Sequence, residues 1–598
     1  MFLKKVISTL VIVSVCILNV NCTQEKKNKL VLASLAYLFV QSQARSSNCN
    51  YKDFTTDGAA DPFYSSQWYY SNSGEDLNPS SVWNTNRGDN IRVAVVDDGM
   101  DIYHEDLSTN VLPGGSYNFG AGYYGFSTSL SDPYSTDATH GTAVSGVIGA
   151  RDKNGLGIAG IASRSCLVGY NVLENATDAN INTAMTYNAS DVSASNNSWG
   201  ATDGNGKTAS GGSLWSSGVD LGLSTGRGGK GTVYFWAAGN GANTNNATGA
   251  SGSSSAYPVG SLETDNSNYD GQANYYGVAA ICALTDDGKR VYYSEKGANL
   301  LVCGYAQKTT YSTTQDGIWT TDITGYYGYN PLPTSYIING YSQGKQLSNN
   351  NYSKIFNGTS GATPMATATA ALILNANSNL SWRDVKLIFA ESARKNDPTD
   401  SDWTTNAGTK ISSSGTAYNI NHKYGFGVID INRAVTIAKT WTNVGAMVMY
   451  DTGTITANTA FANNTTLAAG ATSTKAITTA NTSITKIEFI EVTVSTSSAD
   501  ASDLEIALTS PQGTSSTLAE AHICSSSTYT YPSSTTMVDS CGNYSGWVFG
   551  TVRHLGETAI GTWTLRVADR RSGTGSSSGW GNGGTLTSWR LKFYGRAN

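Results

Sequence analysis

The stretch IRVAVVDDG, Ile91–Gly99, joins a run of apolar, mostly β-branched residues to two carboxylates at its end. Such a run predicts a buried strand. Residues 61–445 alternate runs of this kind with helical runs of small residues, a pattern typical of an α/β fold with a mostly parallel sheet. The carboxyl ends of parallel strands form a ligand crevice. Asp97 and Asp98 therefore mark the edge of the sheet where we expect a functional site.

From about Gly445 onward the composition shifts to Thr-, Ser- and Asn-rich turns between short segments of alternating polarity. KIEFIEVTVS, Lys486–Ser495, and GTWTLRVAD, Gly561–Asp569, alternate as strands with one buried face do. This pattern predicts an all-β sandwich or jelly roll. A chain of 598 residues is too long for one ordinary core, so we expect two domains, residues 61–444 and residues 445–598.

Charged residues are sparse: they make up 14% of the chain, and the formal net charge is −6. No long basic run occurs, which argues against nucleic acid as a partner, because phosphate capture needs clustered Lys and Arg. The abundant tyrosines and tryptophans are therefore expected in packing and cleft lining.

The N-terminus has the features of a bacterial secretion signal. The basic residues of MFLKK precede an apolar run, Val6–Val20, which is too short to span a bilayer comfortably. Leu18–Cys22 resembles a loose lipoprotein cleavage box, in which Cys22 would become the lipidated first residue; a plain signal peptide cut nearby is the alternative. A second apolar run, Leu30–Val40, leaves open where processing stops. We expect residues 1–22 to be the signal and the protein to be secreted or lipid-anchored at the cell envelope.

Six cysteines follow this signal, and none forms the CxxC pair that zinc sites use. The secreted context favours disulfides, although six cysteines allow many pairings. We expect Cys282 to pair with Cys303 and Cys524 with Cys541, because each pair closes a short loop within one predicted domain.

One serine lies in a small-residue run, NGTSGATPMA, Asn357–Ala366, ahead of an alanine-rich helical segment. A serine hydroxyl becomes a nucleophile only when a positioned base takes its proton and an acid orients that base. His140 opens the predicted helix HGTAVSGVIGA, and Asp97 ends the predicted strand. The chain order Asp97, His140, Ser360 predicts a catalytic triad in the subtilisin order, rather than a simple Gly/Ser turn.

Five motifs extend this pattern along the chain: VVDDGMDIYHEDL, HGTAVSGVIGA, NNSWGATDG, FWAAGNG and NGTSGATP. With lesser stretches such as YGFGVIDINRAV, they make residues 61–598 resemble the subtilisin-like serine peptidases, and more narrowly the kexin and furin group of proprotein convertases. The resemblance implies a subtilisin-like sheet flanked by helices, a C-terminal P domain, and a serine endopeptidase that acts through an acyl-enzyme.

The resemblance also implies the catalytic roles. Asp97 would orient His140, His140 would act as general base and then acid, and Ser360 would be the nucleophile. Asn240 in AAGNG matches the side-chain donor to the oxyanion, with the backbone N–H of Ser360 as its partner.

Carboxylates match the family's substrate pockets. Asp203 in SWGATDG and Asp270 in NYDG match acids that line the pocket for the residue before the cut, and Asp98 and Asp137 match those that face the residue before that. Because carboxylates neutralise buried Lys and Arg side chains, we expect cleavage after paired basic residues. Two uncharged residues fall near the places of the acids that in furin select a basic residue further upstream: Ile181 and Ala209.

Crowded carboxylates also imply a hard cation, and Ca²⁺ takes several oxygen ligands at once. By resemblance, Asp203, Asp265 and Glu295 hold one Ca²⁺ beneath the specificity pocket. A second Ca²⁺ site would take the side chains of three further residues: Asp61, Asp106 and Asn154.

Only residues 23–60 separate the predicted signal from the catalytic region, and we expect no recognisable prodomain among them. Family members usually carry an inhibitory prosegment that templates folding, so we expect folding to use a separate helper protein, or calcium and the β domain. Two alternative functions stay open. One is a broad-specificity subtilisin in which Asp203 and Asp270 only hold metal, and the other is a non-catalytic surface adhesin that keeps the fold.

Overall fold

The computed structural model describes residues 60–72, 74–122, 127–242, 263–312, 315–325, 327–330, 336–338, 341–343, 346–413, 415–522, 524, 541–570 and 583–597. All of them belong to one compact unit, Asn48–Asn598. The predicted signal, Cys22 and the N-terminal segment up to residue 59 lie outside the described residues. Within the described part of the chain, no helix has both the length and the apolar character needed to cross a membrane.

The first sheet has eight strands in the order β10-β7-β6-β5-β4-β3-β1-β2. Its strands are β1 (Arg92–Val96), β2 (Cys166–Tyr170), β3 (Val192–Asn197), β4 (Val233–Ala237), β5 (Val278–Thr285), β6 (Leu300–Ser312), β7 (Gln315–Thr321) and β10 (Tyr352–Phe356). Strands β1 to β6 pair in parallel, and β7 and β10 pair antiparallel. Every residue of β1, β2 and β4 is buried, which explains their continuous apolar runs. The predicted α/β fold with a mostly parallel sheet is confirmed.

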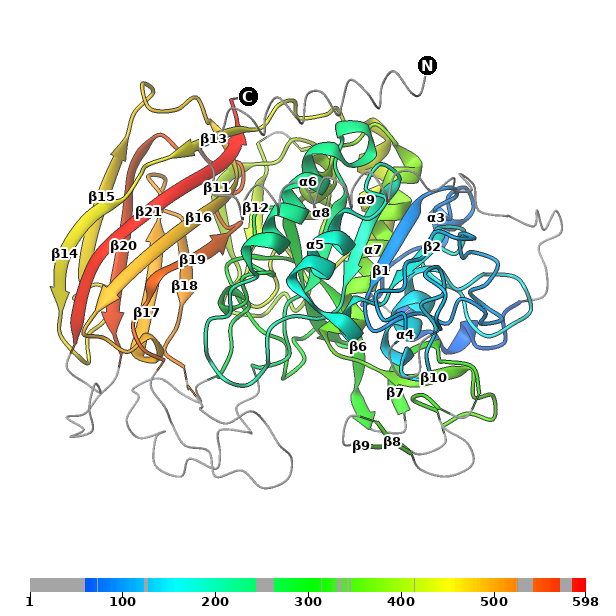
Figure 1. Cartoon of the computed structure of the whole chain (residues 1–598). Coiled ribbons are helices and arrows are strands. Elements are labelled where there is room, and N and C mark those ends of the chain that lie inside the picture. Colours follow the sequence, from blue (N-terminus) through cyan, green and yellow to red (C-terminus); the bar gives the residue numbers. More distant parts are fainter. Residues whose placement is uncertain are drawn as a thin grey trace, which may run out of the picture. The chain divides into compact units, whose positions relative to one another are not determined.

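Seven α-helices accompany this sheet in the described chain: α3 (Ser80–Trp83), α4 (Thr139–Gly149), α5 (Asp178–Thr186), α6 (Ser213–Gly229), α7 (Thr359–Ala376), α8 (Trp382–Ser392) and α9 (Ile431–Thr440) (Figure 1). Shorter elements are η1 (Tyr64–Ser66), η2 (Trp68–Tyr70), η3 (Val172–Asn175), η5 (Ser267–Tyr269) and η6 (Ala501–Asp503), and the hairpins β8 (Tyr336–Ile338) with β9 (Tyr341–Gln343) and β11 (Thr404–Thr409) with β12 (Ala417–Ile420).

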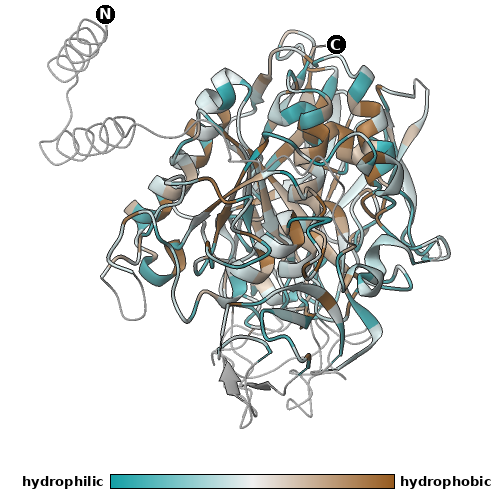
Figure 2. Ribbon diagram, turned by 90° about the vertical axis from the view of Figure 1, so that its right-hand side faces the viewer, coloured by the Kyte–Doolittle hydropathy of each residue, from teal (hydrophilic) through white to brown (hydrophobic). Residues whose placement is uncertain are grey.

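Helix α7 is buried along almost its whole length and packs against β3, β4, β5 and β6. Its small side chains let it lie close to the sheet, and its buried hydroxyls need partners there. Thr363 and Thr369 supply their own, because each donates to the backbone carbonyl four residues earlier at 2.7 Å. Hydrophobic residues accordingly gather in the helices and strands of the interior, as Figure 2 shows. The Ala- and Thr-rich run that predicted a helix after Ser360 is thus a helix fitted to a crowded core.

The C-terminal part holds two antiparallel sheets. One contains β13 (Val448–Asp451), β14 (Ile455–Phe461), β16 (Lys486–Ser497), β19 (Ser545–Thr551) and β21 (Gly584–Arg596), and the other contains β15 (Ala471–Ile477), β17 (Leu504–Thr509), β18 (Ser515–Ala519) and β20 (Gly561–Asp569). Inward-facing residues of both sheets form one core around Trp563 and Trp589. The predicted all-β sandwich is confirmed, and the domain boundary near residue 445 remains a prediction.

The predicted disulfides Cys282–Cys303 and Cys524–Cys541 are both present in the structure. The first joins directly opposite residues of the neighbouring parallel strands β5 and β6.

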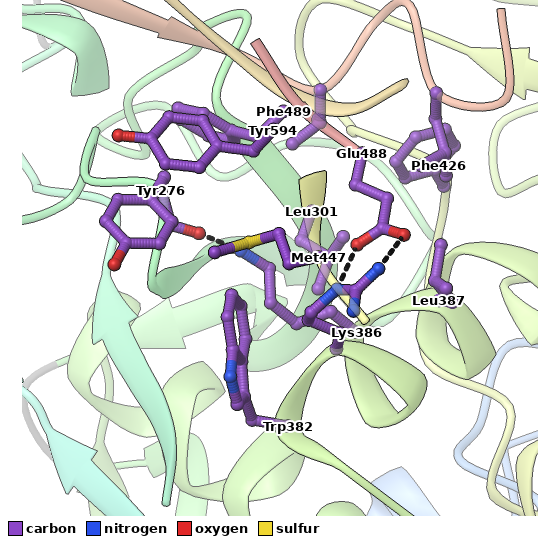
Figure 3. A pocket seen from close by; sticks show the side chains of 13 residues that line it. Tyr276, Leu301, Trp382, Lys386, Leu387, Phe426, Met447, Glu488, Phe489 and Tyr594 are labelled. Atoms are coloured by element: carbon purple, nitrogen blue, oxygen red, sulfur yellow. Dashed lines mark hydrogen bonds and ion pairs between the residues drawn. The ribbon is translucent and has the colours of Figure 1, made fainter. Parts of the chain in front are cut away.

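Helix α8 contacts the five-stranded C-terminal sheet through a buried ion pair (Figure 3). Arg383 donates two hydrogen bonds of 2.7 Å to Glu488, and Arg596 at the end of β21 donates a third of 2.9 Å. Nearby, Lys386 Nζ donates to the backbone carbonyls of Tyr276 and Val278 at 2.8 and 2.7 Å. Tyr276, Arg383, Lys386 and Glu488 line a cavity of only about 30 Å³, so this contact is packing and not a substrate site.

Replacing Glu488 by Gln is expected to lower the free energy of unfolding by about 3–5 kcal/mol, because two buried guanidinium groups lose their counter-charge. The Glu488 and Arg383 side chains are only 10% and 6% exposed. Urea unfolding measures the change. The matched control is Glu505→Gln, whose pair with Arg570 is more exposed and is expected to contribute less than about 1 kcal/mol. Equal losses in the two variants would contradict a special role for the buried pair.

Candidate active site

The first sheet and two helices bring the predicted triad residues to one edge of the fold. Asp97 follows β1 and is fully buried, and its Oδ1 lies 2.8 Å from Nδ1 of His140 in the first turn of α4. Ser360 lies in the first turn of α7. The His140 ring lies 5.4 Å from the ring of Phe356, four residues before Ser360. The predicted acid and base are therefore already paired, with the predicted nucleophile on the neighbouring helix.

Asp98 holds His140 in place by capping α4. Its Oδ2 accepts from the His140 N–H at 3.1 Å, and its Oδ1 accepts from the Gly141 N–H at 2.8 Å. Gly141 is required there, because a Cβ would lie 2.0 Å from the carbonyl oxygen of Gly99. Carboxylates stabilise the N-terminus of a helix, where backbone N–H groups lack partners. Asp98, expected at a substrate subsite, thus has a local structural role as well.

The carboxylates of Asp97 and Asp98 also change the pKa of His140. Burial alone would disfavour the imidazolium, but Asp97 and Asp98 outweigh it and raise the pKa of His140 above its ordinary value. Burial and the charge of Asp97 in turn raise the pKa of Asp98.

The Ser360 hydroxyl donates to the backbone carbonyl of Ser198 at 3.1 Å. The Ser198 hydroxyl donates back to the Ser360 carbonyl, also at 3.1 Å. Among the described residues, Ser360 Oγ makes no hydrogen bond to His140. Catalytic hydrogen bonds often tighten only when substrate is bound. Ser198, in the motif NNSWG, was not among the predicted site residues.

Asn240 follows β4, and its side-chain oxygen accepts from the backbone N–H and the hydroxyl of Thr359 at 2.8 and 3.0 Å. Thr359, the residue before Ser360, therefore fixes the orientation of the Asn240 side-chain amide. Because the oxygen is occupied, the NH₂ end of Asn240 is the part that can donate to a reacting carbonyl.

A cavity of about 230 Å³ lies beside Asn240 and is walled by carboxylates. The wall contains four acidic residues: Asp203, Asp265, Asp270 and Glu295. Lys207 and Tyr269, which were not predicted, line the same cavity. Asp98 and Asp137, predicted to face the next substrate residue, do not line it; Asp98 is half-buried and Asp137 is exposed.

Three of these acids cluster closely: ligand oxygens of Asp203, Asp265 and Glu295 all lie within 4.8 Å of one another. Burial, reinforced by the Asp203 charge, raises the pKa of Asp265 to about 7. Burial and the charges of Asp265 and Asp203 raise the pKa of Glu295. Three carboxylate groups at this spacing fit a hard cation with oxygen ligands such as Ca²⁺.

Asp270 stands apart from that cluster and is held by backbone N–H groups. Its Oδ2 accepts from Ala201 at 2.9 Å, and its Oδ1 accepts from Gln272 at 2.7 Å. The residue is half-buried. A fixed, partly exposed carboxylate in a cavity wall can receive a cationic side chain.

The structure also brings together Asp61, Asp106 and Asn154. Asp61 accepts from the backbone N–H groups of Lys153 and Asn154 at 2.9 and 3.1 Å, and Asp106 accepts from the Asn154 side-chain amide at 2.7 Å. Burial raises the pKa of Asp106 to about 8, and the charge of Asp61 adds to this. The two carboxylates suit a hard cation, although Asn154 directs its NH₂ group, not its oxygen, at Asp106.

Comparisons with known proteins match both parts of the chain. The family model described as "Subtilase family" matches residues 88–427, and "Proprotein convertase P-domain" matches residues 487–593. Neuroendocrine convertase 2 of Drosophila melanogaster, Protease KEX1 of Kluyveromyces lactis and human furin are each 28% identical over 90% of this chain. This chain spans 72%, 60% and 58% of those three proteins, respectively.

Two solved structures of an Aeromonas sobria serine protease are similar in fold. One superposes with a TM-score of 0.71 at 25% identity and covers 92% of this chain and 100% of that one. The other contains the protease in complex with a chaperone; it has a TM-score of 0.72 at 25% identity and covers 93% of this chain and 98% of that one.

Proposed function

The chain belongs to the subtilase family, a family of serine endopeptidases, and from this premise we propose that it cleaves peptides after basic residues and depends on Ca²⁺. One observation carries the proposal. The cavity beside Asn240 is walled by carboxylates from three separate segments of the chain, which suits a cationic side chain better than an apolar one.

The side chains account for acyl-enzyme chemistry. Ser360 turns from the Ser198 carbonyl toward His140, which takes the hydroxyl proton through Nε2 as Oγ attacks the peptide carbonyl. Asp97 stabilises the imidazolium. The oxyanion accepts hydrogen bonds from the Asn240 NH₂ and the backbone N–H of Ser360. His140 then gives its proton to the leaving amine, the C–N bond breaks, and water hydrolyses the ester by the same steps in reverse.

In this proposal, four carboxylates select the substrate by its basic residues. Asp203 and Asp270 receive the basic side chain before the cut, and Asp98 and Asp137 face the residue before that. Ile181 and Ala209 are uncharged and fall near the places of the acids that select a basic residue further upstream in furin. Recognition therefore extends to paired basic residues and no further upstream.

Ca²⁺ at two sites supplies positive charge that offsets the repulsion between neighbouring carboxylates. Asp203, Asp265 and Glu295 hold the first ion. Asp61 and Asp106 hold the second, with Asn154 once its side-chain amide is turned to present oxygen.

We propose that the protein acts outside the cytoplasm, secreted or anchored through a lipid on Cys22, and that a separate protein assists its folding. The similarity to a protease solved with its chaperone supports a folding helper.

The pH dependence of kcat/KM tests the triad geometry. The base must be neutral, so activity rises as pH passes upward through the pKa of His140. Asp98→Asn removes one of the two charges that raise this pKa, so the acid limb of the profile is expected to shift to lower pH. A limb that stays in place or moves to higher pH would contradict the assigned pairing.

A fluorogenic peptide ending in Lys-Arg tests the proposed function. Wild type is expected to cleave it faster than an Ala-Phe peptide, and a calcium chelator is expected to abolish cleavage and lower the melting temperature. A ligand present at 100 times its Kd contributes about 2.7 kcal/mol of stability. Equal rates on the two peptides would favour the broad-specificity alternative, and activity unaffected by the chelator would remove Ca²⁺ from the proposal.

A further inference from the structure

His522 comes from the C-terminal part of the chain and contacts two segments that line the acidic cavity. It follows β18 by three residues and is only 4% exposed. Its Nε2 lies 2.9 Å from the carbonyl oxygen of Gly206, and its Nδ1 lies 3.1 Å from the hydroxyl of Tyr269. The sequence separation of more than 250 residues in both contacts explains why no local pattern singled out this histidine.

Both contacts of His522 are with segments that form the wall of the acidic cavity. Gly206 donates its N–H to Asp265 at 2.5 Å and belongs to the turn that follows Asp203. Tyr269 lines the cavity, and its ring centroid lies 4.7 Å from that of His522. Asp270 is the next residue along the chain. One imidazole ring therefore contacts the two segments that carry the acids Asp203 and Asp270.

One of the two neutral forms of the ring hydrogen-bonds to both Gly206 and Tyr269. Burial lowers the pKa of His522, so the ring is neutral and has a single N–H. An N–H on Nε2 donates to Gly206, and the Tyr269 hydroxyl then donates to Nδ1. With the N–H on Nδ1 instead, the ring would donate to the Glu520 carbonyl oxygen, 2.8 Å from Nδ1, and the lone pair on Nε2 would face the Gly206 oxygen at 2.9 Å. The Nε2–H form satisfies the contacts to both walls.

The segment around His522 is fastened on both sides. Glu520 forms an ion pair of 2.8 Å with Lys296, the residue after Glu295. Cys524 is joined to Cys541, and the two sulfur atoms lie 3.4 and 3.1 Å from the Gly206 carbonyl oxygen. The ring thus contacts the cavity-lining segments from a loop that is held by an ion pair and a disulfide.

We propose that His522 is a positioning residue for substrate specificity: by donating to Gly206 and accepting from Tyr269, it fixes the spacing of the acids that receive the basic side chain. This rests on the proposed function. Affinity for a basic residue is then set partly by a side chain of the C-terminal β part, which does not touch the substrate.

Two substitutions separate this role from general packing. The amide of His522→Gln can place its NH₂ group where Nε2–H stood, whereas His522→Leu cannot donate. The Leu variant is expected to raise KM for the Lys-Arg peptide roughly tenfold, the effect of losing one buried hydrogen bond, with kcat within about threefold of wild type. The Gln variant is expected to keep KM close to wild type. Should His522→Leu fail to fold, His522→Asn replaces it, because its shorter side chain is polar but does not reach Gly206.

Hydrogen exchange of residues 200–210 gives a second readout that needs no substrate. Faster exchange there in the Leu variant, restored in the Gln variant, supports the proposal, and labelling of Ser360 by a fluorophosphonate verifies that each variant is folded. The proposal is overturned if the Leu variant has the KM and the exchange rates of wild type. It is also overturned if the Leu and Gln variants change KM and exchange equally. If wild type shows no preference for basic peptides, the proposed function fails, and the exchange comparison alone decides whether His522 positions the loop.

Discussion

Replacing Ser360 by Ala is expected to lower kcat on a Lys-Arg peptide by roughly 10⁴- to 10⁶-fold, the usual loss when a triad nucleophile is removed. The fold is expected to survive, because within the described residues the Ser360 hydroxyl donates a single hydrogen bond, to the Ser198 carbonyl. KM is expected to change little, because the proposed binding of the basic side chain uses the acidic cavity and not Ser360. Steady-state kinetics and circular dichroism measure the three quantities.

The matched control is Ser378→Ala, at an exposed serine just beyond the end of α7, which is expected to leave kcat within about twofold of wild type. A fluorophosphonate should label wild type and Ser378→Ala but not Ser360→Ala. Folded wild type that neither cleaves the peptide nor takes the label would point instead to the surface-adhesin alternative.

Replacing Asp270 by Asn is expected to lower kcat/KM for a substrate with Arg before the cut by roughly 10²- to 10³-fold, because the cation then enters the cavity without one of its counter-charges. The Asn oxygen can still accept a bond from Ala201 or Gln272, so the local backbone is retained. The measurement compares Arg and Phe before the cut in otherwise identical peptides.

The expected signature is a change in preference and not in overall activity. Cleavage of the Phe peptide should stay within about threefold of wild type, and Asp178→Asn, at an exposed carboxylate in the first turn of α5, should affect neither substrate. If both peptides lose activity equally, Asp270 serves the fold and not specificity.

The sequence could predict what local patterns encode. The continuous apolar run before Asp97 predicts a buried strand, and the small residues after His140 and Ser360 predict helices that fit a crowded core; all three elements are found. Short loops likewise predicted both disulfides correctly. In each case the physical cause lies within a few residues of its effect.

Other features depend on contacts between residues that are far apart in the sequence. The carboxylate of Asp98 was predicted only as a substrate contact, yet both its oxygens accept bonds from the start of α4. Ser198 presents a backbone carbonyl to Ser360, which no side-chain motif can reveal. No local pattern singles out His522, because its partners Gly206 and Tyr269 lie hundreds of residues away in the chain.

The pairing order of the C-terminal sheet has a consequence for the timing of biosynthesis. Strand β21 pairs with β13, β14 and β16, all of which precede it in the chain, and it ends in Arg596, one of the two guanidinium partners of Glu488. While a chain emerges from the ribosome or a translocation pore, the triad residues are exposed long before this strand is available. The sheet that supports α8 therefore closes only after β21 has emerged, so the segments that carry Asp97, His140 and Ser360 are synthesised well before the support of α8 is complete.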